Sequence, residues 1–200
     1  MGWFGPSKDE VWRQLSQEIG AEFVEGGFWT STGSKVQAHV GPWIVTLDIG
    51  RSDEDGKSTV TRLRAPYVNP EGFRFTIYRK GFLSDLGKLL GMQDIEVGDP
   101  EFDEAFIVKG NDEPKVRALF AKPQIRQMIK AQPEFRLDVK DSEGWFGPRF
   151  PDDVDELHFQ VVGVIKDLER LKALFDLFAA VLEALCRVGS AYKREPGITL

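Results

Sequence analysis

The stretch Gly-Asp-Pro-Glu-Phe-Asp-Glu-Ala-Phe-Ile-Val-Lys-Gly, residues 98–110, separates two parts of the chain with different periodicity. It is typical of a turn, an acidic run and a short apolar strand, which we predict at Ala105–Lys109. Phe102, Phe106 and Val108 would point one way, toward the core. The part before this stretch is predicted to be rich in β-strands, and the part after it rich in helices.

Toward the N-terminus, Ser7 and Glu10 have the spacing of a capping box, which predicts a short helix ending at Gly20. From Phe23 to Arg79 apolar and polar residues alternate in runs bounded by Gly-Pro, Asp-Gly and Asn-Pro-Glu-Gly turns. Short connections of this kind predict antiparallel strands with one buried face. We also predict a charged hairpin tip at residues 53–56 and a helix over residues 81–91.

Toward the C-terminus, Asp112 and Pro123 are predicted to open two short helices, and residues 135–139 and 157–161 alternate as strands do. A long amphipathic helix is predicted from its cap at Asp167 to about Val188. Its broad apolar stripe favours packing on the protein's own sheet, and a helix-to-helix homodimer is the alternative.

These patterns predict an α+β fold, in which an antiparallel sheet carries an N-terminal helix, short central helices and a long C-terminal helix packed on it. The chain is predicted to divide near residue 97 into an N-terminal helix with a β-rich subdomain, residues 1–97, and an α+β subdomain, residues 98–200. One continuous domain is the alternative.

The composition of the chain argues against several classes of function. The chain has 200 residues and a net charge of −6, which argues against wholesale binding to nucleic acid or to an anionic membrane. A single cysteine, Cys186, cannot form an internal disulfide, and the N-terminus lacks the pattern of a signal peptide. No apolar run approaches the roughly 20 residues that span a bilayer. We therefore expect a cytoplasmic protein.

Basic residues concentrate in the β-rich part, where six cations and one acid lie between Gly56 and Lys80. Arg62, Arg64 and Arg74 fall on the polar phase of two strands that we expect to be adjacent, and His39 falls on the polar phase of an earlier strand. The first hypothesis is a site for an anionic ligand or a protein partner. The alternative is a solvated sheet face on which these arginines pair with nearby carboxylates.

Enzyme signatures are absent from the sequence. It contains no phosphate-binding glycine loop, no dinucleotide fingerprint and no nucleophile elbow, so no cofactor is expected. The histidines are His39 and His158, and no cluster has the spacing of a metal site, so none is expected. A hydrolase of unrecognised type would have to use His39 or His158 with a carboxylate as general base.

The pentapeptide Gly-Trp-Phe-Gly-Pro occurs twice, at residues 2–6 and 144–148. Two turns that pin aromatic pairs to the core are the simpler interpretation. Exposed aromatic tips that dock on a partner are the alternative, and burial of Trp3 and Trp145 would exclude it.

Residues Gly98, Asp99, Pro100, Phe102, Asp103, Phe106 and Val108, followed by Asp112, Leu119 and Pro123, make the second half of the chain similar to a class of uncharacterised bacterial proteins. The resemblance brings no catalytic residue. It implies a structural role, in which Phe102, Phe106 and Val108 fill the core while Asp99 and Asp103 accept hydrogen bonds from backbone donors in the turn. We therefore favour a non-enzymatic binding or scaffolding protein.

Overall fold

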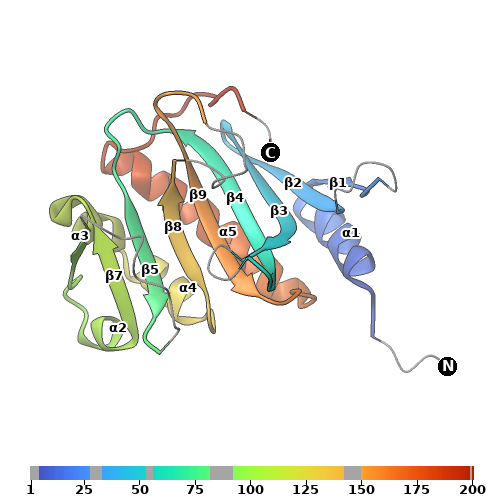
Figure 1. Cartoon of the computed structure of the whole chain (residues 1–200), viewed down its shortest axis with the longest axis horizontal. Coiled ribbons are helices and arrows are strands. Elements are labelled where there is room, and N and C mark those ends of the chain that lie inside the picture. The colour runs from blue at the N-terminus through green and yellow to red at the C-terminus, as the bar shows by residue number, and fades with distance from the viewer. Residues whose placement is uncertain (1–4, 28–32, 53–55, 82–91, 142–149, 199) are drawn as a thin grey trace.

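The computed structural model describes residues 5–27, 33–52, 56–81, 92–141, 150–198 and 200 (Figure 1). Its elements in chain order are α1 Lys8–Ile19, β1 Glu22–Val24, β2 Lys35–Val40, β3 Trp43–Arg51, β4 Thr59–Val68, β5 Phe75–Arg79, β6 Gln93–Asp94, α2 Pro100–Ala105, β7 Phe106–Gly110, α3 Glu113–Phe120, α4 Pro123–Lys130, β8 Arg136–Lys140, β9 Val154–Val162 and α5 Leu168–Arg187.

The helix ends follow local chemistry. Ser7 and Glu10 form the predicted capping box of α1, and Gly20 ends that helix with a left-handed φ of 67°. Asp112 accepts a hydrogen bond from the backbone of Lys115 at the start of α3, and Asp167 does the same for Arg170 at the start of α5. The predicted caps are confirmed.

The stretch at residues 98–110 contains one element that the sequence pattern missed. Pro100–Ala105 forms the short helix α2, because the Asp99 side chain accepts from the Phe102 N–H and Pro100 occupies the first turn. The predicted strand follows as β7, shifted by one residue. Asp103 accepts from the N–H groups of Val97 at 2.8 Å and Gly98 at 3.0 Å, which confirms the predicted role of the two aspartates.

All strands of the described residues belong to one nine-stranded sheet, in the order β1-β2-β3-β4-β9-β8-β5-β7-β6. Every pairing within it is antiparallel, which with the helices confirms the α+β class. Strands β9 and β8 lie between β4 and β5. The prediction that the strands of Arg62, Arg64 and Arg74 are adjacent is therefore wrong, because long-range pairing separates two strands that follow each other in the chain.

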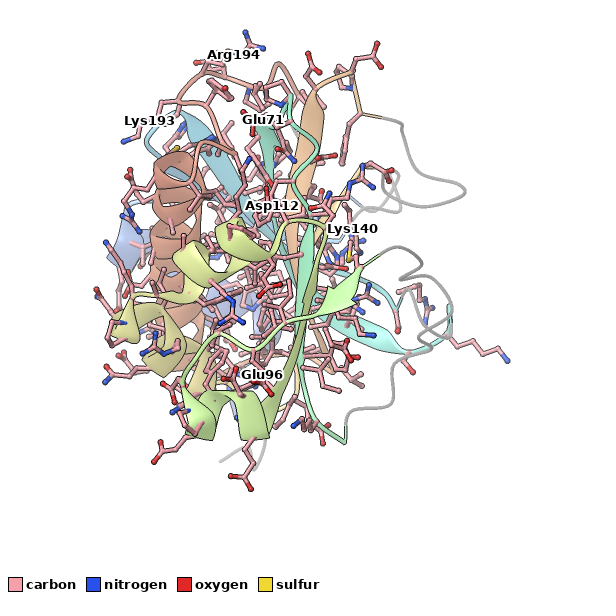
Figure 2. All side chains as sticks on the ribbon, turned by 90° about the vertical axis from the view of Figure 1, so that its left-hand side faces the viewer. Glu71, Glu96, Asp112, Lys140, Lys193 and Arg194 are labelled. Carbon is pink, nitrogen blue, oxygen red and sulfur yellow. The ribbon has the colours of Figure 1, made fainter. Side chains whose placement is uncertain are left out.

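The helices cover one face of the sheet, and the core lies between them (Figure 2). The apolar stripe of α5 is buried within this single chain, as its residues Leu171, Leu174, Phe178, Val181 and Leu185 show. Packing of α5 on its own sheet is the predicted arrangement. A homodimer through this helix stays a prediction, and it would have to use the exposed side of the helix.

Phe102 and Phe106 reach the core as predicted, with their ring centroids 4.8 Å apart. At the end of β7, Gly110 lets helix α3 approach the sheet closely. A Cβ atom on Gly110 would lie 2.5 Å from Val116 Cγ2 and 3.2 Å from the carbonyl oxygen of Arg74. Only glycine fits this contact without a shift of its neighbours.

Several predictions concern residues that lie outside the described part of the chain. The helix predicted over residues 81–91 lies, beyond Gly81, outside the described residues, as do most of the hairpin tip at residues 53–56 and the residues Trp3 and Trp145. Strand β4 from the first predicted subdomain pairs with β9 from the second along its length. The division near residue 97 stays a prediction.

No helix among the described residues has the length and apolar character needed to cross a membrane.

Candidate functional site

The face of the sheet opposite the helices carries charged side chains. Alternate residues of β3, β4, β8 and β9 turn away from α5, as Lys140 does in Figure 2. We call this set the charged face. Its members are Asp48, Arg62, Arg64, Arg136, Asp138, Lys140, Glu156 and His158.

The strand register arranges six of the eight members of the charged face, together with neighbouring residues, in two rows that cross the sheet. The inner row consists of Thr46, Arg64, His158, Asp138 and Thr76. The outer row consists of Asp48, Arg62, Gln160, Arg136 and Tyr78. Facing residues of antiparallel strands have Cβ atoms about 5 Å apart, so neighbours within a row are in reach of each other.

Burial differs between the rows. Every member of the inner row is buried. In the outer row, the side chain of Arg62 keeps 23% of its surface exposed, and that of Arg136 keeps 15%. The next register pair beyond the outer row includes Val162, which is 58% exposed. Access to solvent therefore increases from the inner row toward this end of β9.

Arg62 and Arg64 share one carboxylate. The Nε and Nη2 atoms of Arg62 donate to the two oxygens of Asp48, each at 2.8 Å, and Nη2 of Arg64 reaches the same carboxylate at 2.5 Å. Arg64 also lies 3.8 Å from Glu156. Arg62 and Arg64 therefore pair with nearby carboxylates, as the alternative interpretation of the sequence predicted.

Gly50 makes room for the guanidinium of Arg62. A Cβ atom built on Gly50 would lie 2.4 Å from both Cζ and Nε of Arg62. The side chain of Arg62 thus lies directly over the backbone of β3, where it is held in the forked geometry that a carboxylate requires.

His158 lies between a carboxylate and an ammonium group. Its Nδ1 is 3.2 Å from Oδ1 of Asp138, and its Nε2 is 3.2 Å from Nζ of Lys140. A neutral imidazole with its proton on Nδ1 fits both contacts, because Nδ1 then donates and Nε2 accepts. Arg136 completes this group with an ion pair to Asp138 at 2.8 Å.

The surroundings of Asp138 control its ionisation. Burial by itself would raise the pKa of the Asp138 carboxyl. The hydrogen bond from His158 and the charges of Lys140 and Arg136 outweigh burial and lower this pKa to about 2. Asp138 is therefore ionised at neutral pH.

The two rows contain buried polar atoms that have no hydrogen-bond partner in the described part of the chain. They include the Tyr78 hydroxyl, Nε of Arg136, Oε1 of Gln160 and Oγ1 of Thr76. The first three belong to consecutive members of the outer row. Buried polar groups in folded proteins are nearly always paired, so such a gathering calls for an explanation.

The other two predicted site residues lie elsewhere. Arg74 precedes β5 and contacts Asp141 at 2.9 Å and Asp155 at 3.6 Å. His39 is exposed on β2 and lines a cavity of about 180 Å³ together with Glu195 near the C-terminus. The structure therefore brings Arg62 and Arg64 together with His158, and it separates them from Arg74 and His39.

Charge reversal at Arg62 and at Arg64 is a direct test of the predicted site for an anionic ligand, provided that the fold is preserved. Arg64 is buried between Asp48 and Glu156, so a carboxylate in its place would face two others without solvent. Only Arg62 remains suitable for such a test.

A larger cavity of about 420 Å³ lies at the other edge of the sheet, between β6, β7 and helices α2 and α3. Its charged residues are partly engaged with one another, as in the ion pair of Glu113 and Arg117. Within the described residues, no group of three histidine, cysteine, aspartate or glutamate side chains is arranged to hold a metal ion.

Sequence reasoning missed Asp48, Arg136, Asp138, Gln160 and Tyr78. The alternation of Arg136, Asp138 and Lys140 with apolar residues is visible in the sequence and places all three on one face of a strand. The missing information was the strand order, because it brings β8 and β9 beside β4.

Neither a family model nor a curated protein matches this sequence. Its fold is similar to the crystal structure of the mycobacterial trehalose monomycolate transport factor A, TtfA, with a TM-score of 0.52 and 10% sequence identity. The match covers 90% of this chain and 95% of the other. At this identity the likeness establishes a shared fold. The resemblance to a bacterial family in the second half of the chain stays a prediction.

Proposed function

We propose that this protein is a non-enzymatic binding protein that holds an anionic ligand on the charged face. One observation carries the proposal: Arg62, Arg64, Arg136 and Lys140 gather on one sheet face of a chain whose net charge is −6. Three carboxylates accompany the four cations, so the face is slightly positive within an acidic molecule. A ligand anion would be attracted to this face and repelled by the rest of the surface.

One further fact supports a binding role, and another bears on the location of the protein. The structural neighbour is named a transport factor, and a protein of that kind need not carry out chemistry on what it binds. The single cysteine, Cys186, suits the reducing cytoplasm that we propose as the location of this protein.

The test is native mass spectrometry of the protein purified gently from its own host, as the wild type and as Arg62→Gln. The wild type should carry a small anionic mass, and Arg62→Gln should retain roughly a tenth of it or less, because a charge-assisted contact is lost. Arg64 still pairs with Asp48 in that variant, so the fold should be preserved.

Arg117→Gln is the matched control, since Arg117 is a half-exposed arginine of α3 that pairs with Glu113. It should retain the ligand. The proposal would be contradicted if the wild-type protein carried no small molecule, or if Arg62→Gln and Arg117→Gln carried equal amounts of it. A bound protein chain in place of a small mass would identify a macromolecular partner instead, and the mass of the intact species also tests the homodimer.

A hydrolase-like enzyme is the second candidate, favoured by the contact of His158 with Asp138. An aspartate that orients a histidine is the arrangement of a general base. The Nε2 atom that would accept a proton is engaged by Lys140, so Lys140 would have to turn aside for the reaction.

Hydrolysis of p-nitrophenyl acetate tests this candidate. If His158 is a general base, His158→Gln should lower the rate roughly 100-fold or more, while His39→Gln should leave it unchanged. Equal rates in the wild type and in His158→Gln would exclude a hydrolase that uses His158 as its general base.

A further inference from the structure

We propose that Tyr78, Arg136 and Gln160 form the subsite in which the charged face binds a small oxyanion that carries a neighbouring hydroxyl group. The inference rests on the proposed binding function and names the ligand chemistry for the same face. It is carried by three unpartnered polar atoms that the strand order places side by side.

The three residues are neighbours on one face of the sheet. Tyr78 of β5 faces Arg136 of β8, and Arg136 faces Gln160 of β9. Each alternates with core residues of its own strand, such as Ile77 and Leu137, so all three side chains leave the sheet on the side away from the helices.

Each residue contributes one polar atom without a partner. Tyr78 and Gln160 are buried, with 2% and 4% of their surface exposed, and the Tyr78 hydroxyl and Gln160 Oε1 have no hydrogen bond within the described chain. Arg136 uses Nη2 for Asp138, while its Nε has no partner. An unpaired buried polar atom destabilises the fold, and three in a row indicate that another molecule pairs with them.

The donor and acceptor pattern defines the ligand. The Nε–H of Arg136 and the hydroxyl of Tyr78 can both donate to an anionic oxygen. Oε1 of Gln160 only accepts, so the ligand must also donate, and a hydroxyl beside the anionic group does so. Arg62, the next member of the outer row, supplies a second cation.

The outer row is also the more accessible of the two rows, because two of its arginines reach solvent. The side chains of Arg62 and Arg136 keep part of their surface exposed, whereas the inner row is buried. A ligand that approaches from the side of Val162 therefore meets the outer row first.

The experiment is a titration of the full-length protein, followed through the ¹⁵N–¹H signal of Arg136 Nε. Glycolate serves as the hydroxycarboxylate probe and glycerol 3-phosphate as the hydroxyphosphate probe, and their relative affinities distinguish the two kinds of anion. One of them should shift the signal and saturate it. Acetate, which lacks the hydroxyl, should bind about tenfold more weakly than glycolate if the carboxylate is the preferred anion.

Tyr78→Phe is the decisive variant, because it removes one donor and leaves the ring in place. It should weaken binding of the preferred probe about tenfold while its melting temperature is unchanged or higher, since the lost hydroxyl has no partner in the free protein. Tyr192→Phe, at a half-exposed position near the C-terminus, should bind as the wild type does.

Two results would overturn the inference. One is the absence of saturable binding by both probes, and the other is equal affinity of Tyr78→Phe and the wild type. A lower melting temperature of Tyr78→Phe without probe binding would assign the hydroxyl to a structural water. If Arg62→Gln loses its co-purifying anion while Tyr78→Phe retains it, the subsite is wrong and the binding function stands. The wild type could also purify without a bound anion and still bind a probe at Arg136. That result would support the subsite and contradict the proposal of a tightly bound natural ligand.

Discussion

Asp138 is kept ionised by the groups around it, although it is buried. Its imidazole and cationic neighbours His158, Lys140 and Arg136 come from β8 and β9, and together they lower its pKa to about 2 from the ordinary 3.8. A carboxyl whose pKa is lower in the folded than in the unfolded state stabilises the fold above the unfolded value. That contribution is lost as the pH falls through the folded value.

Asp138→Asn should therefore lower the free energy of unfolding by about 2 kcal/mol at pH 7, at roughly 1.4 kcal/mol for each pKa unit. The difference between wild type and variant should shrink below pH 4 and vanish near pH 2. Urea unfolding at pH 7, 4 and 2.5 measures it. A difference that stays constant over this range would show that ionisation of Asp138 does not stabilise the fold.

Single atoms also decide what the charged face can hold. The guanidinium of Arg62 lies over Gly50 and donates to both oxygens of Asp48, whereas the Tyr78 hydroxyl next to Arg136 has no partner in the described chain. The Arg62 guanidinium is paired in the free protein and the Tyr78 hydroxyl is not, and this is why Tyr78→Phe separates binding from stability.

At the scale of elements, the contact between β7 and α3 depends on one missing side chain. Gly110 lies against Val116 of α3 and the backbone before β5, so β7, α3 and β5 meet at a single residue. The nearer atom belongs to the short, fully buried side chain of Val116 and the next one to the backbone of Arg74, and neither can move aside as the end of a long side chain does.

Gly110→Ala should therefore destabilise the protein by about 1–3 kcal/mol, the usual range for overpacking. Gly50→Ala is the matched control, because its new Cβ would meet only the end of the Arg62 side chain, which can move. It should change the free energy of unfolding by less than about 1 kcal/mol. Thermal or urea unfolding of both variants makes the comparison, and equal losses would refute the proposed tight contact at Gly110.

At the scale of the whole molecule, the strand order determines which residues meet. Strand β9 comes late in the chain and inserts beside β4, and β8 follows it toward β5. This order places His158 between Arg64 and Asp138, and it separates Arg74 from the other two arginines of the predicted basic site. It also joins strands from both predicted subdomains in one sheet.

The sequence by itself determined the elements and their faces. Capping residues at Ser7, Asp112 and Asp167, the two-residue period of the strands and the apolar stripe of α5 are local signals, and local chemistry is enough to read them. Helix α2 was not predicted, because Pro100–Ala105 is too short to show a helical period.

The tertiary structure alone decided the charged face. Arg136, Asp138 and Lys140 are readable as the polar side of a strand, but nothing local says which strand lies beside it. Pairing between β4 and β9 joins residues that are far apart in the chain, and it is selected by burial of the whole apolar face of the sheet. The physical reason is that side-chain direction is a property of the local backbone, whereas the identity of a neighbour depends on how the entire core packs.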